Sequence, residues 1–247
     1  HHTDLEAGLF LSRIEWDLYN FALDRQGITL GLQELAKDVR GEATAHFSDD
    51  ISRVAIFVSK QSHCLIDLLW RVQSGELPMK VPVVISNHQD LEPICNEFDV
   101  DYKFIPNNST CKNNSEQIMI DIIKEYQVDL VVLAKYMQIL TGNFIRQSPS
   151  IINIHHSFLP AFKGAHPYHK AWTRGVKLIG ATAHYVTEKL DDGPIVEQTI
   201  AHVSHRDEIA DLIRKGRDTE RIALATALRL HLYRQVMVYR GRTAVFA

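Results

Sequence analysis

The sequence predicts an α/β protein in which a mostly parallel β-sheet carries helices on both faces and follows a small α+β module. From residue 52 onward, short apolar runs rich in β-branched residues alternate with segments of helical periodicity. This alternation is typical of right-handed βαβ units. The first 50 residues differ, because they hold one amphipathic segment between short strand-like runs. We therefore expect two parts, residues 1–50 and residues 51–247.

Composition excludes several classes of protein. The 247 residues are 45% hydrophobic and 23% charged, which is an ordinary globular balance. The net charge of −3 disfavours a nucleic-acid surface, and no run approaches the roughly 20 apolar residues of a membrane helix. Three widely spaced cysteines indicate neither a disulfide framework nor a paired metal site. We expect a reducing compartment, either the cytoplasm or an organellar matrix.

The first part predicts a strand, helix and strand arrangement. Residues Gly8–Trp16 alternate partly and predict a hairpin arm, and Thr44–Phe47 predicts a further strand. Between them, Gly27–Arg40 has apolar residues at positions 28, 32, 35 and 39, the spacing of a helix that Gly41 ends. So small a module cannot bury a core alone, and open strand edges commonly pair with a second copy. We therefore predict a homo-oligomer.

The second part predicts alternating strands and helices. The predicted strands are Arg53–Val58, Val81–Ser86, Tyr102–Ile105, Leu130–Ala134 and Ile151–Ile154. The predicted helices between them are Cys64–Val72, Leu91–Phe98 and Glu116–Tyr126. Beyond residue 176, the apolar runs Leu178–Tyr185 and Ile195–Val203 predict antiparallel additions, and a helix around residues 217–236 closes the domain. The whole pattern is that of a Rossmann-like sheet.

Polar groups gather at two places where chemistry is expected. In an open parallel sheet, ligands bind beyond the carboxyl ends of the strands. Asn153 and His155 end a predicted strand and point to the same face, because strand side chains repeat every two residues. An amide beside an imidazole suits a carbonyl that becomes an oxyanion. A hydrogen-bonded structural histidine is the commoner explanation of a lone His155 at a strand end, and Asp191-Asp192-Gly193 is either a carboxylate source or an ordinary turn.

Several motifs together resemble the folate-dependent formyltransferases. They are Asn153-x-His155, Ser157-x-Leu159-Pro160, Gly164, Leu190-Asp191-x-Gly193-Pro194 and the run from Leu133 to Leu140. The resemblance covers about residues 52–245. Within this family, His155-His156-Ser157-Phe158, Pro167-Tyr168-His169 and Gly180–Tyr185 are most similar to the formyltetrahydrofolate deformylases. Leu159-Pro160 is a candidate cis peptide bond.

The resemblance implies hydrolysis of 10-formyltetrahydrofolate to formate and tetrahydrofolate, within one-carbon and purine metabolism. It implies that Asn153 binds the formyl oxygen, that His155 stabilises the oxyanion and moves protons, and that Asp191 orients His155 and polarises water. The folate is the substrate, and no permanently bound cofactor is implied. The implied substrate-binding residues are Met137, Gln138, Ile139, Leu140, Ile145 and Leu190. Gln138 stands where relatives often have an arginine.

The deformylases carry an N-terminal ACT domain, and residues 1–50 resemble only its second half. Control by an amino acid such as glycine or methionine follows from this resemblance alone. The predicted strand Arg53–Val58 runs into Ser59–Cys64, which contains no glycine. A phosphate-bearing acceptor usually needs glycines at this place, so the sequence favours water as the acceptor.

Three other interpretations remain open at this stage. The first is a formyltransferase that acts on an amine, such as a glycinamide ribonucleotide transformylase. The second is a folate-binding or amino-acid-sensing protein without catalysis. Binding alone does not explain the set of Asn153, His155 and Asp191, which argues against this interpretation. The third is a metal site among the histidines at 155, 156, 166, 169 and 184, although a zinc-hydrolase pattern such as HExxH is absent from the sequence. We predict that no metal is bound.

Overall fold

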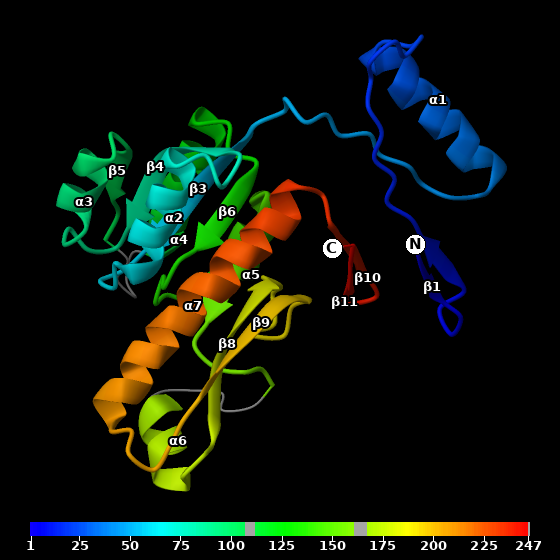
Figure 1. The fold of residues 1–247 in the computed structure, drawn as a ribbon. Coiled ribbons are helices and arrows are strands. Elements are labelled where there is room, and N and C mark those ends of the chain that lie inside the picture. Colours follow the sequence, from blue (N-terminus) through cyan, green and yellow to red (C-terminus); the bar gives the residue numbers. More distant parts are fainter. Residues whose placement is uncertain (107–111, 161–166, 247) are drawn as a thin grey trace. The chain divides into compact units, whose positions relative to one another are not determined.

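The structure, a computed structural model, describes residues 1–106, 112–160 and 167–246. It divides into two units, residues 1–51 and residues 52–245 (Figure 1). In the described ranges, no helix combines the length and the hydropathy that crossing a lipid bilayer requires. Gly164 and His166 of the sequence analysis, and Cys111, lie outside the described residues.

The first unit has little buried surface. Strands β1 (His2–Asp4) and β2 (Leu9–Leu11) pair antiparallel, and helix α1 (Arg25–Asp38) follows. Asp24 caps α1 by accepting a hydrogen bond of 2.8 Å from the backbone N–H of Gly27. Within residues 1–51, only Ile28 and Ala36 are buried apolar residues. The assignment of this unit as part of an ACT-like module remains a prediction.

A seven-stranded sheet organises the second unit. Its strands, in spatial order, are β5 (Asp101–Phe104), β4 (Met79–Ser86), β3 (Ser52–Val58), β6 (Leu130–Leu133), β7 (Ser150–His155), β8 (Leu178–Tyr185) and β9 (Ile195–His202). The five strands from β5 to β7 are parallel, whereas β8 and β9 are antiparallel additions. The predicted mostly parallel sheet, with its two antiparallel strands, is confirmed.

Helices cover both faces of the sheet, as predicted. Along β3, alternate side chains enter two separate clusters, Val54 and Ile56 in one, Ala55 and Phe57 in the other. The first cluster includes residues of α2 (His63–Gln73), α3 (Glu92–Glu97) and α7 (Ile209–Leu232). The second includes residues of α4 (Lys112–Glu125) and α5 (Gly142–Gln147). Helix α6 (Pro167–Arg174) packs with β8 and α7 in a third, smaller cluster.

Three element predictions need correction. Thr44–Phe47 is not a strand but irregular backbone. The predicted hairpin arm at Gly8–Trp16 begins earlier, because β1 already pairs with β2 from residue 2. The closing helix begins at Ile209, eight residues before the predicted start, where Glu208 and Asp211 form a capping box.

The helix also ends earlier than predicted, at Leu232. The chain then forms a hairpin of β10 (Val236–Tyr239) and β11 (Arg242–Val245). Its two-residue turn, Arg240-Gly241, has positive φ at both positions, the backbone form that suits such a hairpin. The predicted helix, which runs to about residue 236, overlaps the start of this hairpin.

Candidate active site

The two strand-end residues of the predicted catalytic set lie at the carboxyl end of β7. In the β7–β8 pairing, Asn153 lies opposite His184 and His155 lies opposite Thr182. The neighbours Ile152 and Ile154 enter the cluster under α7, so Asn153 and His155 share the other face, as their spacing predicts. The antiparallel strand therefore adds His184 to that face.

Asp191 meets His155 although the two residues are far apart in sequence. Nδ1 of His155 lies 3.3 Å from Oδ1 of Asp191, and Nε2 of His184 lies 3.9 Å from the same oxygen. The hydrogen bond with His155 lowers the pKa of Asp191 below its ordinary value, although burial opposes the shift. The side chain of His155 is 8% exposed, and its Nε2 is buried without a hydrogen-bond partner among the described residues.

His184 orients the amide of Asn153. The Nδ1 atom of His184 lies 2.9 Å from the carbonyl oxygen of Tyr185, so this nitrogen carries the proton that is donated. Burial lowers the pKa of His184 below its ordinary value, which favours the neutral ring. In that tautomer Nε2 accepts the hydrogen bond of 3.2 Å from Nδ2 of Asn153. The second N–H of the Asn153 amide remains for another acceptor.

The turn that carries Asp191 depends on a close backbone approach. Asp191 itself has a φ of 53°, and Gly193 follows two residues later. A Cβ atom on Gly193 would lie 1.7 Å from the carbonyl oxygen of Tyr185, so a side chain does not fit there. The backbone N–H of Tyr185 donates to the carbonyl oxygen of Pro194 at 2.9 Å, which closes the turn. The predicted Asp191-Asp192-Gly193 motif is thus a turn that also brings a carboxylate to His155.

Thr182 and Gln198 hold the segment after His155. The hydroxyl of Thr182 donates to the carbonyl oxygen of Ser157 at 2.8 Å and accepts from the N–H of Leu159 at 3.0 Å. Gln198 donates to the carbonyl oxygen of Leu159 at 2.9 Å. The Leu159-Pro160 bond is cis, as the sequence analysis anticipated.

The loop between β6 and α5 is fastened at both ends. The N–H of Met137 donates to Oγ of Ser59 at 2.9 Å, and Ser59 in turn donates to Oδ1 of Asn87 at 2.7 Å. At the other end, the N–H of Thr141 donates to the buried Glu116 at 2.9 Å. These bonds tie together the ends of three neighbouring parallel strands.

The six predicted substrate-binding residues differ in exposure. Met137, Ile139 and Leu190 are exposed to 61%, 60% and 59%. Gln138 is partly buried, whereas Leu140 and Ile145 pack into the cluster under α4 and α5. The turn that holds Leu190 reaches α5 through an ion pair of 2.5 Å between Arg146 and Glu188.

A second polar cluster, which the sequence patterns did not predict, lies around Glu220 on the opposite face of the sheet. This carboxylate is 2% exposed and accepts hydrogen bonds from His63, Lys135 and Tyr168. A signal was available, because Glu220 interrupts an apolar helical stripe that includes Leu212, Ala223 and Ala227.

The cluster around Glu220 also includes a group of metal-ligating type. Donor atoms of His63, Cys64 and Glu220 lie within 4.8 Å of one another. The ammonium group of Lys135 lies 3.0 Å from the same carboxylate, and burial raises the pKa of the Cys64 thiol. Both features oppose a bound cation, because a thiol must lose its proton to become a good ligand.

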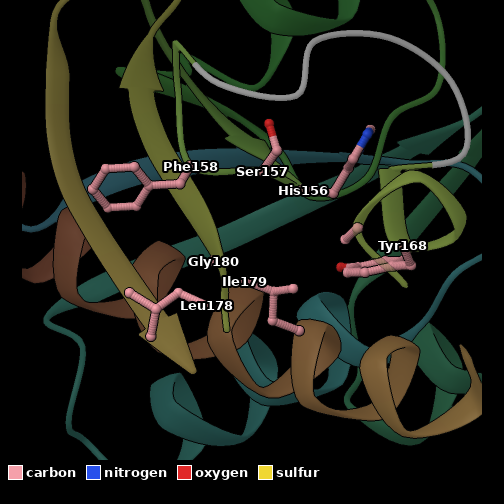
Figure 2. A pocket seen from close by; sticks show the side chains of 8 residues that line it. His156, Ser157, Phe158, Tyr168, Leu178, Ile179 and Gly180 are labelled. Atoms are coloured by element: carbon pink, nitrogen blue, oxygen red, sulfur yellow. The ribbon is translucent and has the colours of Figure 1, made fainter. Parts of the chain in front are cut away.

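A small, mostly apolar pocket lies between β8, α6 and the segment after β7 (Figure 2). Figure 2 shows Tyr168 and Ile179 on one side of it and Phe158 and Leu178 on another. Its lining residues are His156, Ser157, Phe158, Tyr168, Ala171, Leu178, Ile179 and Gly180. Among the described residues, this lining includes none of the predicted catalytic or substrate-binding residues, so the pocket and the candidate site are adjacent but different features.

Comparison with known proteins agrees with this geometry. Residues 52–228 match the Formyl transferase family. The formyltetrahydrofolate deformylase of Synechocystis sp. is 55% identical over all of this chain and 87% of its own length. The crystal structure of a formyltetrahydrofolate deformylase from Pseudomonas syringae pv. tomato superposes with a TM-score of 0.88 at 44% identity, covering 92% of this chain and 76% of that one.

A more distant solved structure has the same fold. Glycinamide ribonucleotide transformylase 1 from Symbiobacterium toebii gives a TM-score of 0.75 at 29% identity, over 83% of this chain and 99% of that one. The identity is thus markedly higher to the deformylases than to this transformylase. The chain belongs to the formyl transferase family, and within it to the formyltetrahydrofolate deformylases.

Proposed function

We propose that this chain hydrolyses 10-formyltetrahydrofolate to formate and tetrahydrofolate. The observation that carries the proposal is the convergence of an amide, an imidazole and a carboxylate on one face of β7. Asp191 lies 3.3 Å from His155, and His184, whose Nε2 lies 3.9 Å from the same carboxylate oxygen, accepts a hydrogen bond from the amide of Asn153. Such a set can stabilise an oxyanion and transfer protons beside it.

In the proposed mechanism, water attacks the formyl carbon and the carbonyl π electrons move to the oxygen. Nε2 of His155 takes a proton from the attacking water, and the resulting N–H, together with the N–H of Asn153 that does not bind His184, donates a hydrogen bond to the developing oxyanion. The intermediate then collapses, the C–N bond breaks, and N10 leaves with the proton that Nε2 of His155 had taken from water, while the formic acid formed ionises to formate. The product is formate, and the folate is released as tetrahydrofolate.

Asp191 contributes a fixed negative charge to this mechanism. Its pKa lies below the ordinary value, so the carboxylate stays ionised throughout the neutral range. From 3.3 Å it keeps Nδ1 of His155 protonated and turns Nε2 toward the reacting group. The same carboxylate is the group that accepts a hydrogen bond from the attacking water.

The exposed loop between β6 and α5 supplies the proposed pterin site. Met137 and Ile139 are exposed apolar side chains on a loop whose backbone is fixed through Ser59 and Glu116. Backbone N–H and C=O groups between Met137 and Leu140 can satisfy the donors and acceptors of the pterin rim. Gln138 carries no charge, so we propose no ion pair between it and the glutamate tail.

Water, and not a phosphate-bearing amine, is the proposed acceptor. The first strand of the parallel sheet leads into a loop without glycine, and the side chain of His63, the first residue of α2, binds Glu220. The protein's own carboxylate thus lies beside the helix start where an anionic acceptor usually binds. Lys135 is engaged by the same carboxylate.

The wider proposals follow from the family. We propose that the enzyme works with no permanently bound cofactor, in the cytoplasm, as a homo-oligomer. Residues 1–50 are proposed as part of an ACT-like module that takes an amino-acid effector such as glycine or methionine. Residues 51–247 are proposed as the catalytic domain.

Formate release from 10-formyltetrahydrofolate without any acceptor tests the function. We expect wild-type protein to release formate and His155→Ala to lose nearly all of this activity, with both proteins folded by circular dichroism. Activity should persist after exhaustive chelation. Formyl transfer that occurs only after a ribonucleotide acceptor is added would instead support the transformylase alternative, and tetrahydrofolate binding without turnover would support a binding protein.

A further inference from the structure

The carboxylate of Glu220 lies outside the proposed catalytic set, yet Glu220 is the most deeply buried charged residue among those the structure describes. It is 2% exposed and belongs to α7, on a helix face with Gly216 and Ala223. An ionised carboxylate in such a place needs several hydrogen-bond donors. Burial raises the pKa of Glu220, but the hydrogen bond and charge of His63, together with Lys135, outweigh burial and lower it to about 2.

Among the described residues, three donors bind this carboxylate, and each belongs to a different connection. Nε2 of His63 lies 2.6 Å from Oε2, and Nζ of Lys135 lies 3.0 Å from Oε1. The hydroxyl of Tyr168 donates to Oε1 at 3.2 Å. His63 follows β3, Lys135 follows β6 and Tyr168 follows β7, and these three strands are neighbours in the sheet. One side chain therefore links three connections at the edge where the proposed site lies.

The surrounding backbone is shaped to permit this arrangement. Lys135 has a φ of 67°, the left-handed form, and its side chain is 6% exposed. On α7, one turn before Glu220, Gly216 has no side chain, and a Cβ there would lie 2.0 Å from the hydroxyl of Tyr168. The phenol thus occupies space that any other residue at 216 would fill. Burial and the charge of Glu220 raise the pKa of Tyr168, which keeps its hydroxyl as a donor.

The link to the proposed site runs through short stretches of chain. Lys135 stands two residues before Met137, whose N–H is bonded to Ser59 at 2.9 Å. A shift of Lys135 therefore moves the backbone that is proposed to bind the pterin. Tyr168 fixes the start of α6, the helix that follows the catalytic segment in sequence, and it also lines the pocket beside His156 (Figure 2).

We propose that Glu220 is a positioning residue for the hydrolysis proposed above, because its carboxylate fastens the connections after β3, β6 and β7 in one geometry. It does not touch the substrate. Replacing a buried ion cluster with uncharged residues often costs little stability, so stability alone does not account for the arrangement. A loss of positioning of about 1 Å is sufficient to reduce turnover roughly 10²-fold.

Glu220→Gln is the primary test, because it keeps the size of the side chain and removes the charge. We expect kcat/KM for formate release to fall roughly 10- to 100-fold. Hydrogen–deuterium exchange should rise in residues 135–140 and 167–174 and stay unchanged in β4 and β5. The matched control is Asp67→Asn, which breaks a carboxylate–arginine pair of 2.7 Å with Arg71 on α2, and it should leave both readouts at wild-type values. Unchanged exchange and turnover in Glu220→Gln would overturn the proposal.

A double variant separates positioning from stability. Glu220→Gln combined with Lys135→Met removes the unpaired buried ammonium, so its melting temperature should recover toward the wild-type value while kcat/KM stays low. Recovery of kcat/KM together with stability would assign Glu220 a purely structural role. Tetrahydrofolate binding, measured by calorimetry, should weaken in Glu220→Gln. If wild-type protein releases no formate, that result alone refutes the proposed hydrolysis. The binding measurement then still tests whether Glu220 positions the folate site.

Discussion

At the scale of single residues, the site depends on which imidazole nitrogens carry protons. The contact of 2.9 Å between His184 Nδ1 and the carbonyl of Tyr185 fixes the proton on that nitrogen. The other nitrogen then accepts from Asn153, so the amide cannot flip without losing a bond. His155 is oriented in the same way by Asp191. Asn153 and His155 are the groups proposed to face the formyl carbon. Each is thus oriented by another side chain, Asn153 by His184 and His155 by Asp191.

Asn153→Ala tests the role of the amide. We expect kcat for formate release to fall roughly 10²- to 10³-fold, because one oxyanion donor is removed. The free energy of unfolding should change by less than about 1 kcal/mol, since Asn153 is only partly buried and, among the described residues, makes one side-chain hydrogen bond of 3.2 Å. Steady-state kinetics and urea denaturation measure the two effects. Wild-type turnover in this variant would exclude Asn153 as the oxyanion donor.

Glu220 predicts a pH dependence of stability. Its pKa is lowered from 4.5 in the unfolded chain to about 2 in the fold. The stabilisation is therefore fully present above pH 4.5 and is lost as the pH falls toward 2, a total of about 3 kcal/mol. Urea denaturation between pH 6 and about pH 3 should show wild-type protein losing about 2 kcal/mol more than Glu220→Gln. Parallel curves for the two proteins would contradict the lowered pKa.

The sequence identified some site residues and missed others for physical reasons. Asn153 and His155 are two residues apart, which is the spacing of side chains on one face of a strand. This spacing can be read from the sequence alone. The contact of Asp191 with His155 came from family resemblance, because no local pattern reveals a contact across 36 positions of sequence. Glu220 was missed because its three donors lie on separate connections, and only tertiary structure brings them to one carboxylate.

At the scale of helices and strands, the buried elements were the easiest to predict. Strands β3 and β6 are apolar on both faces, and their runs of valine, isoleucine and leucine predicted them within one residue at each end. Thr44–Phe47 was wrongly predicted as a strand, because none of its alternating residues is fully buried and the segment is irregular backbone. The hairpin of β10 and β11 was missed because its signal, the positive φ at Arg240, appears only in the structure.

Gly216→Ala tests the packing of α6 against α7. Alanine normally stabilises a helix interior by up to about 1 kcal/mol relative to glycine. Here its Cβ would overlap the Tyr168 hydroxyl at 2.0 Å, so we expect a net loss of about 1–2 kcal/mol in the free energy of unfolding. Repeating the substitution in a Tyr168→Ala background should reverse its sign, because the overlap is gone. An identical effect in both backgrounds would contradict the packing argument.

At the scale of the whole molecule, the two units differ in how many apolar side chains they bury. The unit of residues 52–245 holds all three clusters of buried apolar side chains, whereas the first unit buries only Ile28 and Ala36. Burial of apolar surface is the main favourable term in folding. The second unit therefore has the core that independent folding requires, and the first does not.

A shortened chain that begins at Ser52 tests this inequality. Every residue proposed for catalysis or substrate binding lies in the second unit, so we expect the shortened chain to fold cooperatively. It should release formate within about five-fold of the wild-type rate, a difference of less than about 1 kcal/mol in activation free energy. If the first unit mediates self-association, light scattering should show a lower oligomeric state, and an effector amino acid should no longer change the rate. A shortened chain that folds but has lost activity by several orders of magnitude would instead mean that the first unit, or the assembly it forms, completes the site.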